Sequence, residues 1–199
     1  MRRQIDQTGG ATASATPGAC YYPGPMRSLL HVRPARPDDA DAMAGVHVES
    51  WRQTYRGLMR DEVLDDPGLL PARGRFWQAV LTEERYEPFR AAVAESDDAV
   101  VGIALAGPAT EADVAWDTQL YVLYLLDAFH GSGAGRGLME AVLPAGISAG
   151  LWVADPNPRA QAFYAKQGFE PDGVTKVDDG VREVRLVRAA TAKSPSGTV

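Results

Sequence analysis

Residues 119–143 read QLYVLYLLDAFHGSGAGRGLMEAVL, and this stretch decides the fold. Residues 119–126 are apolar on both faces of an extended chain, which is typical of a central strand covered on both sides. Glycines follow at positions 131, 133, 135 and 137, and a helix is predicted over residues 135–143. Between a buried strand and a helix, such a turn lets backbone N–H groups approach an anion, and the helix dipole adds to the attraction. The stretch therefore predicts an α/β fold with a turn that binds phosphate or pyrophosphate.

Two other phosphate-binding motifs can be compared with the spacing of these glycines. A dinucleotide-binding fingerprint that begins at Gly131 needs a small residue at position 136, where Arg136 stands. A P-loop needs Gly-Lys followed by Ser or Thr, which the turn lacks. Neither motif fits, so a Rossmann-type NAD enzyme is disfavoured. A glycine-rich turn can also be a plain connection, so the turn alone leaves its ligand open.

The rest of the chain supplies strands and helices on either side of this stretch. Ser96, Asp97 and Asp98 separate two runs rich in Val, Ile and Ala, which is a hairpin signal. No internal repeat or interior linker interrupts the pattern, so one mixed α/β domain is predicted. Strands are predicted over residues 29–32, 88–95, 99–106, 119–126 and 151–154, further helices over 38–55, 70–81 and 158–168, and a closing hairpin over 169–187.

The two ends differ in composition from the middle. Residues 1–26 are rich in Gly, Pro, Thr, Ser and Ala and are predicted to be a disordered leader, residues 27–188 to be the folded domain, and residues 189–199 to be a flexible tail. A secretory signal needs an apolar stretch of about 7–15 residues, which the leader lacks. The sequence contains no run of about 18 apolar residues, the length that could cross a membrane. We therefore expect a cytoplasmic protein with no membrane partner.

Charge and cysteine content exclude several classes of protein. Acidic residues outnumber basic residues by 26 to 20, a formal net charge of −6, which disfavours a nucleic-acid partner and favours a cationic substrate. The single cysteine, Cys20, cannot form an internal disulfide, which indicates a reducing compartment. His31, His47 and His130 are not at metal-ligand spacing, so we expect no metal.

Three segments in order resemble the GNAT-type N-acetyltransferases, in particular bacterial members of that superfamily. In that family the pyrophosphate loop after the fourth strand reads Gln/Arg-x-x-Gly-x-Gly/Ala, and the similar segment here is HGSGAG at 130–135. The family's second signature, an asparagine followed by an aromatic pair and Gly-Phe, looks like Asn157, FY at 163–164 and GF at 168–169. WRQTYRG at 51–57 also resembles the first-helix segment of the bacterial members. The resemblance covers about residues 29–188.

The resemblance implies the GNAT fold, with a central mixed, mostly antiparallel sheet of about six to seven strands, whose fourth and fifth strands splay apart, flanked by about four helices. It also implies acetyl-CoA as the co-substrate. The pantetheine would lie in the gap and hydrogen-bond the main chain of Leu123, Tyr124 and Leu125. Asn157 would reach the same region, although an asparagine before a proline is also an ordinary helix cap. The pyrophosphate would be held by His130, Gly131, Ser132, Gly133, Ala134, Gly135 and Arg136.

Tyr164 matches the general acid of the family. A phenol is still protonated at pH 7, so it can protonate the thiolate that leaves when an amine attacks the thioester. The alternative is an aromatic side chain that only packs in its helix. The backbone N–H of Leu125 would stabilise the developing oxyanion.

The general base is the point at which the sequence departs from the family. Many relatives carry a glutamate on the fourth strand, and Gln119 stands at the matching position here. Asp117 lies two residues earlier on the same strand face, so we expect it to act as the base through a water molecule. A solvated carboxylate at the strand end is the alternative. Members that acetylate protein N-termini often carry a glutamate where this chain has Trp152, which counts against that role.

Acceptor selectivity in this fold is generally set by the first two helices and their loop. Trp51 and Tyr55 lie four residues apart on one helix face, where they would either wall the acceptor pocket or pack on the sheet. Acidic residues at 61, 62, 65 and 66 would either draw a cationic amine or form a solvated face.

Together these observations predict an acetyl-CoA-dependent N-acetyltransferase that acts on a primary amine of a small molecule or peptide. The acetyl group would pass by direct attack in a ternary complex. The alternative is a catalytically weak module that binds or senses acyl-CoA, which Gln119 keeps open. Homodimers are common in the family, often through the C-terminal strands.

Overall fold

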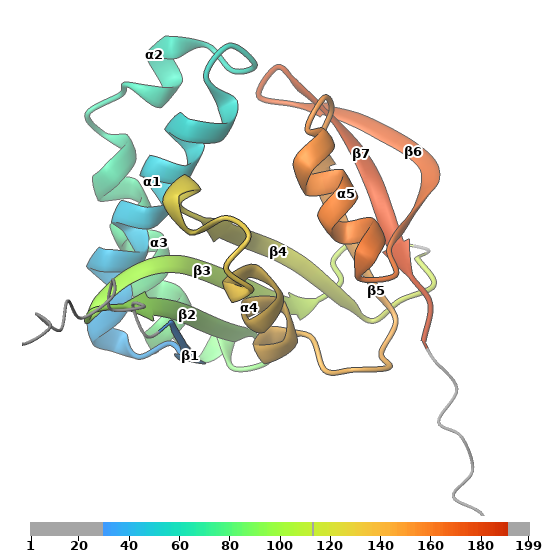
Figure 1. The fold of residues 1–199 in the computed structure, drawn as a ribbon, viewed down its shortest axis with the longest axis horizontal. Helices are drawn as coiled ribbons and strands as arrows, with labels where there is room; N and C mark the ends of the chain where they lie inside the picture. The colour runs from blue at the N-terminus through green and yellow to red at the C-terminus, as the bar shows by residue number, and fades with distance from the viewer. Residues whose placement is uncertain (1–29, 113, 191–199) are drawn as a thin grey trace, which may run out of the picture.

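The computed structural model describes residues 30–112 and 114–190, which form one seven-stranded sheet with helices on both faces (Figure 1). The predicted leader, residues 1–26 with Cys20, lies outside the described residues, and so does most of the predicted tail. The described part of the chain contains no helix long and apolar enough to span a membrane.

The sheet has the order β1-β2-β3-β4-β5-β7-β6. Its neighbouring strands are antiparallel except β4 and β5, which are parallel, so the predicted mixed, mostly antiparallel sheet is confirmed. The strands are β1 (His31–Pro34), β2 (Arg90–Ser96), β3 (Ala99–Pro108), β4 (Thr118–Leu125), β5 (Ala149–Ala154), β6 (Glu170–Asp178) and β7 (Val181–Arg188).

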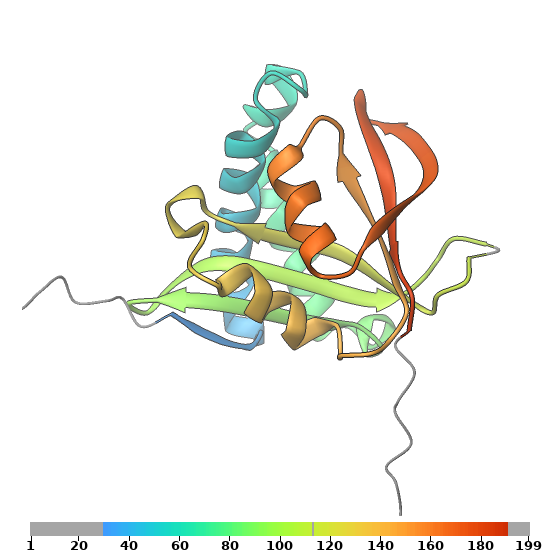
Figure 2. The same cartoon turned by 45° about the vertical axis from the view of Figure 1, so that its right-hand side comes forward.

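Helices cover the two faces of the sheet in pairs (Figure 2). One core cluster packs α1 and α3 against the sheet around Met43 and Trp77, and the other packs α4 and α5 around Leu138 and Phe169. The α-helices are α1 (Ala40–Tyr55), α2 (Asp61–Leu64), α3 (Leu69–Thr82), α4 (Ala134–Val142) and α5 (Pro158–Lys166), and short 3₁₀ helices lie at Pro37–Asp39, Glu84–Tyr86 and Asp127–Phe129. The single turn of α2 contains two of the acidic residues named above, at 61 and 62, and its Leu64 is buried.

The predicted hairpin is confirmed, and the end of the first strand differs from its prediction. The β2–β3 hairpin turns at Asp97 and Asp98, both with positive φ, which is the backbone a two-residue turn of this kind needs. The first strand was predicted to stop before Pro34, but β1 includes Pro34. Because β1 is an edge strand, a proline there need not donate a hydrogen bond to a neighbour.

The feature that creates the site is the divergence of β4 from β5. The two strands pair only at Thr118↔Ala149, Gln119↔Gly150 and Leu120↔Leu151, after which each runs on without pairing to the other. The splayed strands predicted from the resemblance are therefore confirmed. A β-bulge lies where the divergence starts. Leu105 pairs with Val122 and Ala106 with Leu120, which leaves Tyr121 as the extra residue in β4. A bulge bends its strand and increases its twist, which turns the end of β4 away from β5.

Candidate active site

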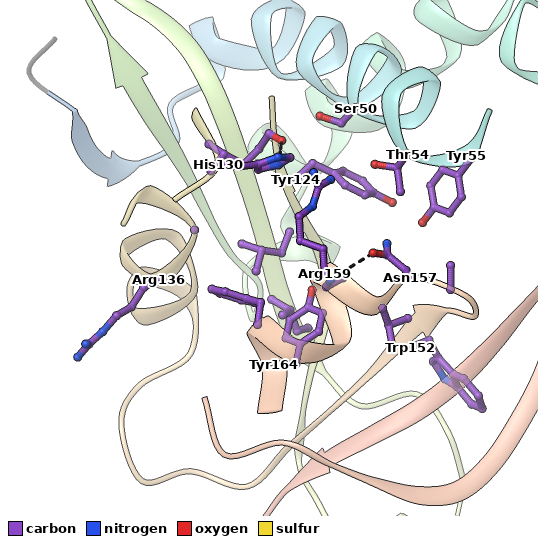
Figure 3. Close-up of a pocket in the computed structure, with 18 of the residues that line it drawn as sticks. Ser50, Thr54, Tyr55, Tyr124, His130, Arg136, Trp152, Asn157, Arg159 and Tyr164 are labelled. Atoms are coloured by element: carbon purple, nitrogen blue, oxygen red, sulfur yellow. Dashed lines mark hydrogen bonds between the residues drawn. The ribbon is translucent and has the colours of Figure 1, made fainter. Parts of the chain in front are cut away.

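A cavity of about 410 Å³ occupies the gap between β4 and β5 and extends from the start of α4 to the side of α1 (Figure 3). Its walls combine leucine and phenylalanine side chains with hydroxyl groups, two arginines and a glycine-rich turn. The lining residues are Ser50, Thr54, Tyr55, Leu120, Tyr121, Leu123, Tyr124, Leu125, His130, Gly131, Gly133, Gly135, Arg136, Trp152, Val153, Ala154, Asn157, Arg159, Ala160, Phe163 and Tyr164.

The backbone of β4 offers hydrogen-bonding groups to this cavity at alternate residues. The N–H of Leu126 donates to the carbonyl of Val101 at 3.0 Å, so the even-numbered residues here direct their main chain toward β3. The N–H and C=O groups of Leu123 and Leu125 therefore point away from β3 and into the gap. The main-chain role expected of Tyr124 is not supported, because its N–H and C=O face β3. Its side chain lines the cavity instead.

The glycine-rich turn presents a second set of free groups. Gly131 and Gly133 have φ of 79° and 92°, a left-handed backbone that favours glycine. Two of the turn's amides are used internally, since the N–H of Ser132 donates to the carbonyl of Phe129 at 3.3 Å and that of Ala134 to Ser132 Oγ at 3.2 Å.

The remaining amides of the turn are free among the described residues. Those of Gly131, Gly133, Gly135 and Arg136 have no hydrogen-bond partner there, and the same four residues line the cavity. They lie at the N-terminus of α4, where free N–H groups and the helix dipole attract an anion. Of the residues predicted to hold the pyrophosphate, these four have a free amide, and their binding role stays a prediction. The side chain of Arg136 points away from the cavity and pairs with Glu140 at 2.7 Å (Figure 3).

Tyr164 is placed at the cavity by α5. It is 8% exposed, its ring packs against Phe163 and Phe169, and its hydroxyl points into the cavity (Figure 3). Burial, and after it the neighbouring Tyr124, raises the pKa of Tyr164 above its ordinary value of 10.0. The phenol therefore stays protonated at neutral pH, which suits a proton donor and not a base.

The structure confirms that Asn157 caps a helix, and its role toward the pantetheine stays a prediction. Its Oδ1 accepts a hydrogen bond from the N–H of Ala160 at 3.1 Å, which caps α5, and the residue also lines the cavity. We expect Asn157→Ala to lower the free energy of unfolding by about 1 kcal/mol, because the capping acceptor is lost. Urea denaturation measures the change, with Asn157→Asp as the control that keeps the oxygen. Equal stability of the alanine variant and the wild type would contradict the capping role.

Aromatic residues close the end of the cavity next to α1. Tyr55 lines the cavity, as expected, whereas Trp51 lies behind it and donates from Nε1 to the hydroxyl of Tyr124 at 2.9 Å. Of the two interpretations of Trp51, packing is the one that the structure supports. His47 lies behind Tyr124 with ring centroids 5.0 Å apart. Burial first, and then the charge of Arg73, lowers the pKa of His47 to about 3.

The neutral state of His47 predicts a pH dependence of stability. Between pH 6.5, its ordinary pKa, and about pH 3, the unfolded chain binds a proton at His47 that the native protein does not bind. Stability therefore falls as the pH is lowered through this range, by about 1.4 kcal/mol per pH unit from this group. Urea denaturation from pH 7 to 5 should show a smaller slope in His47→Gln than in the wild type. His31→Gln, at an exposed histidine, is the control and should keep the wild-type slope. An unchanged slope in His47→Gln would contradict the account.

The expected base is not brought to the cavity. Asp117 is exposed and precedes β4 at the end where β4 still pairs with β5. Gln119 is buried at the same end and lines no part of the cavity. Among the described residues that line the cavity there is no carboxylate. The described chain also holds no group of three or more His, Cys, Asp or Glu side chains that could bind a metal.

Three polar lining residues were missed by the sequence analysis. Ser50 and Thr54 lie four residues apart on the α1 face that meets the gap, a spacing that could have identified them. Ser50 is 2% exposed and its Oγ has no hydrogen-bond partner among the described residues. Arg159, in the first turn of α5, reaches across the cavity (Figure 3). Arg159 could have been identified from its position two residues after Asn157, at the start of the same helix.

A parallel strand pair that opens over a glycine-rich helix N-terminus fits the fold that the resemblance implied, and comparison with known proteins gives the same class of protein. The sequence model of the Acetyltransferase (GNAT) family matches residues 48–169. The chain is 30% identical over 164 residues to the uncharacterized N-acetyltransferase YuaI of Bacillus subtilis, covering 79% of this chain and 89% of that one. It is also 30% identical over 160 residues to the probable N-acetyltransferase Rv2775 of Mycobacterium tuberculosis, covering 74% and 84%.

Solved structures share the fold at low sequence identity. The PaiA N-acetyltransferase of Thermoplasma acidophilum, solved in complex with coenzyme A, has a TM-score of 0.59 and 18% identity, over 78% of this chain and 97% of that one. The structure described as histone acetyltransferase HPA2 and related acetyltransferase, from Corynebacterium glutamicum, has a TM-score of 0.61 and 20% identity, over 83% of this chain and 98% of that one. The chain therefore belongs to the acetyltransferase (GNAT) family, and it is an acetyltransferase.

Proposed function

We propose that this protein transfers an acetyl group from acetyl-CoA to a primary amine of a small molecule or peptide by direct attack within a ternary complex. One observation carries the proposal. Two sets of free main-chain groups, on the glycine-rich turn and on β4, lead along a single cavity to the hydroxyl of Tyr164.

The binding role falls to the main chain. The amides of Gly131, Gly133, Gly135 and Arg136 are free to receive a pyrophosphate at the start of α4. Leu123 and the N–H of Leu125 face the gap where β4 lacks a partner, whereas the carbonyl oxygen of Leu125 lies 2.8 Å from Nε2 of His130. An extended amide-containing chain such as pantetheine can pair with the free groups as an added strand would. These groups support a cofactor with an anionic end and an extended end.

The chemistry needs an oxyanion donor and an acid at the inner part of the cavity. When an amine forms its bond to the thioester carbon, negative charge develops on the oxygen, and the N–H of Leu125 is directed into the gap where it can stabilise that charge. As the carbon–sulfur bond breaks, Tyr164 donates its proton to the leaving sulfur. The attacking nitrogen releases a proton in turn, so the proton count balances once Tyr164 is reprotonated.

The group that accepts the proton of the amine has to be found among the residues and water of the cavity. Presenting a free alkylamine at pH 7 costs about 4.6 kcal/mol, because such an amine has a pKa of about 10.4. Tyr55 and Tyr124 are unsuited as bases, since burial raises the pKa of each. Glu183, which pairs with Ala154 in the sheet, is held by Lys176 at 3.1 Å. Water in the cavity is therefore our candidate for the first proton acceptor.

A thiol-release assay over a panel of amines, with mass analysis of the product, tests the proposal. The expected result is coenzyme A release that depends on an added primary amine, with the amine gaining one acetyl group. The absence of a carboxylate from the described cavity walls favours a second candidate, a module that binds acyl-CoA without turnover. Tight acetyl-CoA binding with no thiol release from any amine would support that candidate, and no binding would contradict both.

A further inference from the structure

Ser50 carries a buried hydroxyl group that the fold does not use. The residue is 2% exposed, and its Oγ has no hydrogen-bond partner in the described part of the chain. A serine inside a helix ordinarily turns its hydroxyl to solvent or donates to the carbonyl four residues earlier. Ser50 lies well inside α1 and does neither. Because a buried polar group without a partner costs free energy, this hydroxyl indicates a site for a bound molecule that supplies the partner.

The contacts of α1 on either side of Ser50 place it against the end of β4. Three residues earlier, the ring of His47 lies 5.0 Å from that of Tyr124, between centroids. Three residues later, Oε1 of Gln53 accepts a hydrogen bond from the N–H of Asp127 at 3.0 Å. Residues three apart in a helix are neighbours on its surface. Ser50 therefore faces the part of the cavity where β4 ends.

The wall that carries Ser50 lies across the cavity from Tyr164. Ser50 and Thr54 line the cavity from α1, and Tyr164 lines it from the opposite side (Figure 3). In the proposed reaction the N–H of Leu125 stabilises the thioester oxygen, and Tyr164 gives its proton to the leaving sulfur. An amine must reach the carbonyl carbon from a side that the sulfur does not occupy. The side opposite Tyr164 is the one that presents the hydroxyl of Ser50.

A serine hydroxyl is suited to hold the nitrogen of an amine. Oγ has lone pairs that accept a hydrogen bond from an N–H group. A primary amine has two N–H groups besides the lone pair with which it attacks. A hydrogen bond from one of them to Oγ of Ser50 would fix the direction of that lone pair, which is a positioning effect. The proton that the nitrogen releases then passes to water, as in the proposed function.

We infer that Ser50 is an acceptor-binding residue, whose Oγ accepts a hydrogen bond from the attacking nitrogen of the amine at the end of β4. This inference rests on the proposed function. The hydrogen bond forms with the amine and not with acetyl-CoA. Its loss therefore raises the KM for the amine and leaves the affinity for acetyl-CoA unchanged. A hydrogen bond of this kind contributes up to about a tenfold factor to binding.

Steady-state thiol release by Ser50→Ala tests the inference, with n-butylamine, putrescine and glycinamide as amines at saturating acetyl-CoA. For the amine with the fastest release, the KM should rise about tenfold and kcat should change less. The dissociation constant of acetyl-CoA, measured by calorimetry, should keep its wild-type value. The urea midpoint should not fall, because alanine is the better helix former and the hydroxyl has no partner to lose among the described residues.

Ser96→Ala is the matched control for the loss of a buried serine hydroxyl. Ser96 is 5% exposed at the end of β2 and does not line the cavity. Its variant should keep the wild-type KM for the amine.

The outcomes separate this inference from the proposed function. A wild-type KM in Ser50→Ala, or a loss of acetyl-CoA affinity in its place, would overturn the role of Ser50 and leave the proposed function standing. A rise in KM together with a lower urea midpoint would mean that the hydroxyl supports the fold, which also overturns the inference. No thiol release by the wild type from these amines or any other of the panel would contradict the proposed function as well.

Discussion

Gly133→Glu is expected to weaken acetyl-CoA binding about a hundredfold or more. Gly133 has φ of 92° and its amide is one of the four free N–H groups of the turn. A Cβ added there meets nothing within 4 Å, so the substitution adds backbone strain from the positive φ but no clash at the Cβ. The glutamate carboxylate would bring negative charge to the turn where the pyrophosphate is expected, and like charges brought together cost several kcal/mol. Calorimetric titration measures the loss.

Two controls separate the charge effect from backbone strain. Gly173→Glu adds the same side chain at a residue of similar φ, 88°, also with nothing within 4 Å, but on β6 outside the cavity. It should bind acetyl-CoA as the wild type does. Gly133→Ala carries the strain without the charge and should bind more tightly than Gly133→Glu. Unimpaired binding by Gly133→Glu would remove the turn from the cofactor site.

Tyr164→Phe is expected to lower kcat about 100-fold to 1000-fold and to leave acetyl-CoA affinity unchanged. The substitution removes only the hydroxyl that points into the cavity, and the packing of the ring on Phe163 and Phe169 is kept. A positioned proton donor contributes a factor of this size to a rate. Steady-state kinetics with a responsive amine, together with a binding titration, measures both quantities.

Tyr121→Phe is the matched control for the loss of a phenol. Tyr121 also lines the cavity, but its hydroxyl donates to the carbonyl of Pro108 at 2.6 Å and is occupied by the fold. Its kcat should change little. Equal rates in Tyr164→Phe and the wild type would mean that the leaving thiolate takes its proton from another source.

Local sequence patterns were sufficient to predict the elements that frame the site. The apolar run of β4, the glycines at 131 and 133 and the cap at Asn157 act through residues close to one another in the chain, so pattern and backbone preference identify them. The hairpin at Asp97 and Asp98 is predictable for the same reason.

The parts that could not be predicted depend on distant residues. Period-two alternation placed Asp117 on the face of Gln119, but pairing with Ala149 and Gly150 of β5 closes that end of the gap. The bulge at Tyr121, which starts the divergence, depends on the register with β3 and has no signature in β4 alone. Arg159 reaches the cavity because α5 packs over the splayed strands, and this tertiary packing cannot be read from the sequence around Arg159.

The most direct test of the central claim is residue-resolved NMR of backbone amides during titration with acetyl-CoA. The account predicts the largest shift changes at the amides of Gly131, Gly133, Gly135 and Arg136 and at Leu123 and Leu125, with β6 unaffected. Ser132 and Ala134, whose amides are already bonded within the turn, should change less. Saturable changes confined to residues outside the gap between β4 and β5 would contradict the account.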